Sequence, residues 1–384
     1  MPKILSDNNS RLLSLDAFRG ATIAGMLLVN NPGDWGNIYR QLEHAPWSGW
    51  TFTDLIFPFF LWIVGVSMTF SIAKRIERGE TKSTLLLHAI RRSVILFALG
   101  MFLGGYPFGL LFGHQFSFAT WRIPGVLQRI AVCYLIATVC YLYLSLRLQA
   151  LVTIALLAGY WLLMALVNVP GFGTGIYAPV GNLCWYIDSH LLAGHTWIYA
   201  PTPGFDPEGF LSTIPAIVTT LFGIFAGKFL RSDRSQEEKT IGLFVAGNTF
   251  LLAGSIMDHW LPINKNMWTS SYAVFMAGMA MIVFAFCYWL IDVKGYRKGT
   301  AFFTIFGVNA IGIYFCSEFL GKLIELINWK SGGETVTLKG FVYHSFFEPL
   351  LAPRNSSFLF AICWVLVMFL FTYILHRKRI IIKV

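Results

Sequence analysis

One histidine of the sequence lies directly before an apolar segment that is long enough to enter a membrane. His44 opens the stretch HAPWSGWTFTDLIFPFFLWIVG, which ends at Gly65. An imidazole has an ordinary pKa near 6.5 and is therefore suited to accept a proton at neutral pH. Asn30 ends the preceding apolar segment and Asp54 opens the following one, so both are expected to flank His44. The stretch therefore predicts proton-transfer chemistry at the boundary between water and a bilayer.

The composition of the whole chain is that of a membrane protein. Of its 384 residues 56% are hydrophobic and 12% are charged, whereas soluble domains average about 25% charged residues. The segment 341–352 is too short to span a bilayer and is expected to form an interfacial or re-entrant helix. We expect an all-α integral membrane protein, one polytopic domain over residues 1–384, with about ten transmembrane helices: 14–31, 52–73, 84–106, 124–144, 148–167, 211–230, 240–257, 268–291, 300–318 and 357–376.

The distribution of basic residues predicts how the chain is oriented. With the N-terminus in the cytoplasm, eighteen lysines and arginines fall in cytoplasmic segments and seven fall on the opposite side. Basic loops stay on the cytoplasmic side of a membrane. Both termini are therefore expected in the cytoplasm, with His44 and a large extracytoplasmic loop, 168–210, on the outer face. The net charge of +10 is mainly a topological signal, and nucleic-acid binding is not expected.

Four charged residues lie near the expected cytoplasmic ends of the first and third helices. Asp16 and Arg19 are three residues apart, so they share a helical face and can form a local ion pair. Arg91 and Arg92 lie one or two turns inside the membrane boundary. There they could extend to lipid phosphates or bind a phosphorylated cofactor that enters from the cytoplasm. Both interpretations fit the sequence.

The outer side carries a second group of polar residues. The loop 168–210 is too long to be a simple connection, and it mixes carboxylates with aromatic side chains. Such a mixture would bind a cationic, sugar-like ligand, although the aromatic residues could equally form an interfacial belt. His190 and His195 lack a third ligand at metal spacing, so no metal site is expected. The candidate substrate-binding residues are Arg122, Asp188, Asp206, Glu208, Asn264 and Lys265.

The segments that carry these residues resemble the heparan-α-glucosaminide N-acetyltransferase family, a group of transmembrane acyltransferases. The matching segments are spread over nearly the whole chain and keep the family's order. They are SLDAFRG (14–20), HAPWSGWTFTDLIFPFF (44–60), RIPGVLQRIAVCY (122–134), FDPEG (205–209), INKNMW (263–268) and GVNAIGIY (307–314).

This resemblance implies a reaction and a site. The family moves an acetyl group from cytoplasmic acetyl-CoA to the amine of a terminal glucosamine on the far side of the membrane. Its catalytic histidine maps to His44, and an active-site asparagine maps to Asn30. The family also favours a homodimer. We expect the chain to lack the extra N-terminal luminal region and first helix of the lysosomal form, and therefore to be a protein of the bacterial inner membrane. The loop 168–210 departs most from the family, so the resemblance does not specify the amino-sugar acceptor.

A mechanism follows from these assignments. Acetyl-CoA would dock its nucleotide at Arg19, Arg91 and Arg92 and thread its pantetheine arm between the helices. His44 would deprotonate the acceptor amine, with Asp54 orienting the imidazole and Asn30 stabilising the oxyanion. In a second route His44 itself would carry the acetyl group. Another class of protein also fits the same features, namely a secondary transporter of amino sugars or their oligosaccharides.

Overall fold

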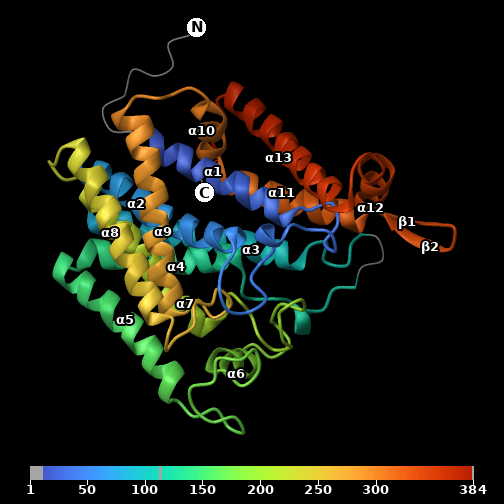
Figure 1. Ribbon diagram of the computed structural model, residues 1–384, viewed down its shortest axis with the longest axis horizontal. Coiled ribbons are helices and arrows are strands. Elements are labelled where there is room, and N and C mark those ends of the chain that lie inside the picture. The colour runs from blue at the N-terminus through green and yellow to red at the C-terminus, as the bar shows by residue number, and fades with distance from the viewer. Residues whose placement is uncertain (1–11, 112–114, 383–384) are drawn as a thin grey trace.

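The computed structural model describes residues 12–111 and 115–382, and its regular structure in these ranges is helical apart from one hairpin (Figure 1). The hairpin pairs β1 (Asn328–Ser331) with β2 (Glu334–Thr337) in antiparallel register. The α-helices of the described residues are α1 (Leu13–Asn30), α2 (Phe52–Glu77), α3 (Lys82–Gly105), α4 (Val126–Tyr143), α5 (Leu146–Leu166), α6 (Leu183–Leu191), α7 (Phe210–Leu230), α8 (Gln236–Met257), α9 (Ser270–Tyr288), α10 (Thr300–Val308), α11 (Ala310–Leu326), α12 (Leu338–Val342) and α13 (Pro353–Arg377).

The helices confirm an all-α membrane protein. Within the described residues, 8 helices are long and apolar enough to cross a membrane, namely α2, α3, α4, α5, α7, α8, α9 and α13, and the bent pair α10–α11 makes up to 9. Helix α1 forms where a span was predicted, but Asp16, Arg19 and Asn30 lower its hydropathy and it is not among them. The predicted total of about ten was therefore close to the number of long apolar helices.

The predicted span 300–318 is not one straight helix. The chain breaks at Asn309, and α10 and α11 meet at an angle of 81°. The Asn309 side chain is buried and bonds the C-terminal segment, since it donates to Ile380 O at 3.2 Å and accepts from Ile382 N at 2.9 Å. A polar side chain held by a distant segment thus marks the break, and no local pattern in the sequence indicates that contact.

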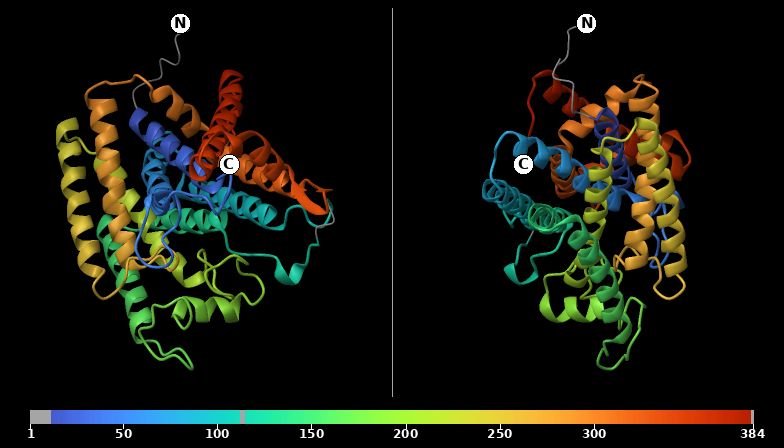
Figure 2. Two further views of the ribbon diagram at one scale, coloured as in Figure 1. Left: turned by 45° about the vertical axis from the view of Figure 1, so that its right-hand side comes forward. Right: turned by 90° about the vertical axis from the view of Figure 1, so that its left-hand side faces the viewer.

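Two further segments contain helical structure: the loop 168–210, where only a loop was predicted, and the segment 341–352, where a short helix was predicted. The loop 168–210 includes the helix α6, and residues of this region form a second hydrophobic cluster with the ends of α5 and α7. Figures 1 and 2 show α6 and its flanking loops at the same end of the bundle as the loop 31–51. The segment 341–352 is a series of short helical turns between the hairpin and α13. The long loop is therefore a packed layer that closes one end of the bundle.

Helix α2, which carries Asp54, packs closely against α7 through small residues. A Cβ atom on Gly65 would lie 2.1 Å from Thr220 O, and one on Gly223 would lie 2.1 Å from Trp62 O. The two glycines face each other, since the added Cβ of Gly223 would be 3.1 Å from the Gly65 Cα. Small residues allow such close backbone approach between membrane helices, where packing drives association. The glycine pair therefore fixes the position of α2 in the bundle.

Replacing Gly223 by leucine is expected to destabilise the protein by about 1–3 kcal/mol, because the larger side chain forces α2 and α7 apart. The measurement is thermal unfolding of the purified protein in detergent. Gly159→Leu on α5 is the matched control, since an added Cβ at Gly159 has open space around it. Equal shifts in Tm for the two variants would contradict the packing argument.

Candidate active site at the start of helix α2

Local sequence explains how Asp54 is held at the start of α2. Thr51 precedes the helix and Asp54 is its third residue, which is the spacing of a capping box. One carboxylate oxygen, Oδ2, accepts the backbone N–H groups of Thr51 at 3.0 Å and of Ala45 at 2.9 Å. The Tyr272 hydroxyl donates to the Asp54 carbonyl at 2.6 Å. Asp54 is therefore fixed, and its second oxygen remains free to hold another group.

That second oxygen holds His44. The distance from His44 Nδ1 to Asp54 Oδ1 is 2.6 Å, so the imidazole donates its Nδ1–H to the carboxylate and Nε2 carries the lone pair. The Asp54 side chain is 1% exposed, whereas that of His44 is 49% exposed. The structure therefore brings together two of the three predicted catalytic residues, in the arrangement that an oriented general base requires.

A lysine from a distant loop faces the free nitrogen of His44. Lys265 Nζ lies 3.3 Å from His44 Nε2. The loop before α9 is tied to the loop before α2 by a hydrogen bond from Gly49 N to Ile263 O at 2.7 Å. Partial burial and the Lys265 ammonium lower the pKa of His44 below its ordinary value, although the Asp54 carboxylate opposes this shift. His44 is therefore neutral at pH 7 and able to accept a proton.

Asn264, beside Lys265, is buried within the same loop. Its Oδ1 accepts Met267 N at 2.9 Å, while its Nδ2 has no hydrogen-bond partner among the described residues. Burying an unpaired amide donor is costly. Asn264 therefore shapes the turn that positions Lys265, while its buried amide donor is left unpaired among the described residues.

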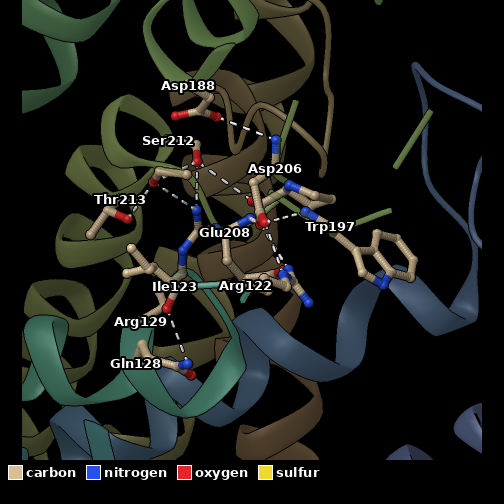
Figure 3. A network of polar contacts seen from close by, with 12 residues as sticks. Arg122, Ile123, Gln128, Arg129, Asp188, Trp197, Asp206, Glu208, Ser212 and Thr213 are labelled. Atoms are coloured by element: carbon tan, nitrogen blue, oxygen red, sulfur yellow. Dashed lines mark hydrogen bonds and ion pairs between the residues drawn. The ribbon is translucent and has the colours of Figure 1, made fainter. Parts of the chain in front are cut away.

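Glu208 and Asp206 share one arginine (Figure 3). Arg122 Nε and Nη2 bond Asp206 at 2.8 and 2.7 Å, and Nη2 also bonds Glu208 Oε2 at 2.6 Å. Burial favours the neutral form of Glu208, but the charges of Arg122, Arg129 and Lys265 outweigh it, so the pKa of Glu208 lies below its ordinary value. The network therefore keeps an ionised carboxylate between two arginines and the lysine that faces His44.

The other predicted acidic ligand in this layer, Asp188, stabilises the entry to α7. Its Oδ1 accepts Phe210 N at 3.1 Å and its Oδ2 accepts Asp206 N at 3.4 Å. The side chain is buried, and burial raises its pKa to about 7. Asp206 is fully buried and bound to Arg122. Both carboxylates are thus engaged inside the protein, where they hold the loop that carries Glu208.

The sequence analysis did not include two charged residues, Glu318 and Arg129, among the site candidates. Asn30 Nδ2 donates to Glu318 Oε1 at 3.1 Å, which places a carboxylate of α11 beside the third predicted catalytic residue. Arg129 is buried, with Nη2 bonded to Ser212 Oγ at 2.5 Å and its guanidinium 5.1 Å from the Trp268 ring. Its Nε and Nη1 have no hydrogen-bond partner within the described part of the chain. In both cases the sequence does contain a signal that could have identified the residue, namely a charged side chain inside an apolar segment.

The predicted cofactor-binding residues form two separate groups. Arg19 bonds Asp16 at 3.1 Å, Ser67 Oγ at 2.7 Å and Gly307 O at 3.2 Å, so it links α1 to α2 and α10. Arg92 lies over the Tyr134 ring at 4.8 Å, while Arg91 is exposed on α3. The local ion pair of Asp16 and Arg19, which their spacing predicted, is present.

No group of three or more histidine, cysteine, aspartate or glutamate side chains is arranged to hold a metal ion in the described ranges. The fold and the site together define a multi-pass membrane protein with a histidine–aspartate pair and a charged network at one end of its helical bundle. This class contains enzymes as well as transporters.

The chain belongs to the heparan-α-glucosaminide N-acetyltransferase family. The sequence model of that family's catalytic region matches residues 11–263, which include His44, Asp54 and the network around Glu208. The chain is 30% identical to heparan-α-glucosaminide N-acetyltransferase of Mus musculus over 100% of its length and 62% of that protein. It is 32% identical to the Homo sapiens protein of the same name over 97% of its length and 60% of that protein. The chain thus spans about three fifths of the length of these relatives.

Proposed function

We propose that the protein is a transmembrane N-acetyltransferase, which moves an acetyl group from cytoplasmic acetyl-CoA to the amine of an amino sugar on the extracytoplasmic side. A terminal glucosamine of a heparan-type saccharide is the acceptor that the relatives' name suggests. The observation that carries the proposal is the 2.6 Å contact of His44 with Asp54. It leaves one imidazole nitrogen as a base at the end of an apolar span, where an outer acceptor can reach it.

In the proposed reaction, His44 Nε2 takes a proton from the acceptor ammonium and the free amine attacks the thioester carbonyl. An N–C bond forms, the C–S bond breaks, and the CoA thiolate leaves and is protonated. The negative charge on the carbonyl oxygen requires a fixed donor, and the Asn30 amide, itself held by Glu318, is proposed for this role. We favour direct transfer over an acetyl-His44 intermediate, because both substrates can then meet at one histidine.

The two sides of the membrane would have separate tasks. We propose that Arg19, Arg91 and Arg92, with Asp16 holding Arg19, receive the nucleotide of acetyl-CoA on the cytoplasmic side. Glu208 and Lys265, with the buried Asn264, would contact the acceptor on the outer side. The proposal further includes both termini in the cytoplasm, a bacterial inner membrane location with His44 toward the periplasm, and a homodimer.

Purified protein, acetyl-CoA and a panel of hexosamines provide the test. Thiol release and mass spectrometry of the sugar should show stoichiometric CoA and N-acetylated product with at least one hexosamine. Uptake of intact radiolabelled sugar into proteoliposomes without acetyl-CoA, and no acetylated product, would instead support the transporter. Wild-type protein with each substrate omitted in turn is the control for spontaneous thioester hydrolysis.

The pH dependence of the rate follows from the electrostatics of His44. Asp54, Lys265 and Glu208 are the charged groups that act on the imidazole, and its pKa lies below the ordinary value of about 6.5. The base must be neutral, so the rate is expected to fall as the pH drops through this lowered pKa, at a lower pH than for an unperturbed imidazole. Lys265→Met removes a positive charge that lowers the pKa of His44. The acid limb of its pH–rate profile should therefore lie at higher pH than that of the wild type. Identical acid limbs for both proteins would contradict this assignment.

A further inference from the structure

The chain places an amine of its own at the nitrogen that is proposed to activate the acceptor amine. Lys265 Nζ lies 3.3 Å from His44 Nε2, and His44 Nδ1 lies 2.6 Å from Asp54 Oδ1. A nucleophile within hydrogen-bond reach of a base, with the base oriented by a carboxylate, is the diagnostic geometry of an activated nucleophile. Lys265 therefore has the position of the acceptor nitrogen itself.

The surroundings of Lys265 favour its reaction as an amine. Burial lowers the pKa of Lys265, and Arg129 and Arg122 act in the same direction, while Glu208 and Asp54 oppose them. A larger fraction of Lys265 is therefore unprotonated at neutral pH than of a solvated lysine. The lysine is partly exposed, and half of the His44 side chain is exposed, so the pair faces solvent on one side. A thioester that reaches His44 can thus also reach Lys265.

We propose that Lys265 is a site of self-acetylation, modified by acetyl-CoA when no acceptor amine occupies the site. This inference rests on the proposed function, because it requires the thioester to reach His44. In the step, the Lys265 ammonium gives a proton to His44 Nε2 and its nitrogen attacks the thioester carbonyl. The N–C bond forms, the C–S bond breaks, and the CoA thiolate leaves and takes up a proton.

The product would switch the site off. An amide does not pass its acetyl group to a sugar amine, so acetyl-Lys265 is an end product and not an intermediate. Acetylation removes the ammonium that faces Nε2 and adds an uncharged group beside the base. An acceptor amine that binds at Nε2 has to displace Lys265, and it thereby protects the lysine. Self-acetylation would therefore limit turnover when the supply of acceptor runs out.

The experiment uses full-length protein in lipid nanodiscs, which expose both faces, with isotopically labelled acetyl-CoA in an amine-free buffer and no sugar. Digestion and mass spectrometry follow the label at Lys265, at His44 and at Lys339. Lys339 is the internal control, since its ammonium contacts the Glu325 carboxylate at 2.8 Å instead of an imidazole. We expect label to accumulate at Lys265 well above Lys339, and His44→Ala to slow its accumulation by about 100-fold. Excess acceptor sugar should protect Lys265.

Thiol release with hexosamines, measured in parallel, separates the two proposals. Sugar acetylation without excess label at Lys265 would overturn the self-acetylation alone, and so would label confined to His44. If neither the sugar nor Lys265 is acetylated, the proposed function fails as well. Lys265→Arg provides a second check, because arginine keeps the charge and is not acetylated. Preincubation with acetyl-CoA alone should reduce the later rate of the wild type, relative to its own starting rate, and should not do so for this variant.

Discussion

Replacing His44 by alanine is expected to reduce kcat for acetyl transfer by about 10²–10⁴-fold, the range that a positioned general base contributes. Asp54 holds one nitrogen of the His44 imidazole, Nδ1, and the other nitrogen, Nε2, faces Lys265. Removal of the imidazole takes away a base and leaves both neighbours in place. Single-turnover formation of N-acetylated sugar measures the loss, and KM for the sugar should change far less than kcat.

Asp54→Asn is the companion variant to the alanine replacement of His44. An asparagine side chain presents an amide to Nδ1, so the tautomer with its lone pair on Nε2 loses its preference, and a comparable loss of rate is expected. Both variants must retain the Tm of the wild type for the comparison to hold. Full activity of His44→Ala in a folded protein would exclude His44 as the base and as an acetyl carrier.

Replacing Arg122 by methionine is expected to destabilise the protein by about 3–5 kcal/mol, because it leaves Asp206 and Glu208 buried without their shared cation. The loop that carries Glu208 should then loosen, and the Tm in detergent should fall well below that of the wild type. Arg354→Met, which removes an exposed arginine, is the control.

A second comparison separates the lost ion pair from the lost packing of the arginine side chain. In the double variant Arg122→Met with Asp206→Asn, one of the two stranded charges is removed, so part of the lost stability should return. A Tm for Arg122→Met within the error of the Arg354→Met value would show that the network does not hold the loop.

The local parts of the site could be predicted from the sequence. The apolar windows indicated the long helices, and the spacing of Thr51 and Asp54 is a capping signal that can be read within four residues. His44 and Asp54 are only 10 residues apart, so their contact needs only a short loop between them. Patterns of this kind depend on near neighbours in the chain and therefore survive in a single sequence.

The rest depends on contacts between distant segments. Lys265 reaches His44 across 221 residues, and Glu318 reaches Asn30 across 288. The predicted outer group contained Lys265 as a substrate ligand, but no spacing in the sequence indicated that its ammonium would face the imidazole. The break at Asn309 depends in the same way on the C-terminal segment. Tertiary packing decides each of these features, and a periodic pattern carries no information about it.

Transfer across a sealed bilayer tests the proposed reaction most directly. Proteoliposomes with the protein in the orientation that places His44 outside would contain acetyl-CoA, and glucosamine or a heparan-type fragment would be added outside only. We expect N-acetylated sugar in the external medium and an equal amount of CoA inside, with His44→Ala producing neither. Product formation only after the membrane is permeabilised would contradict it, since both substrates would then be needed on the same side.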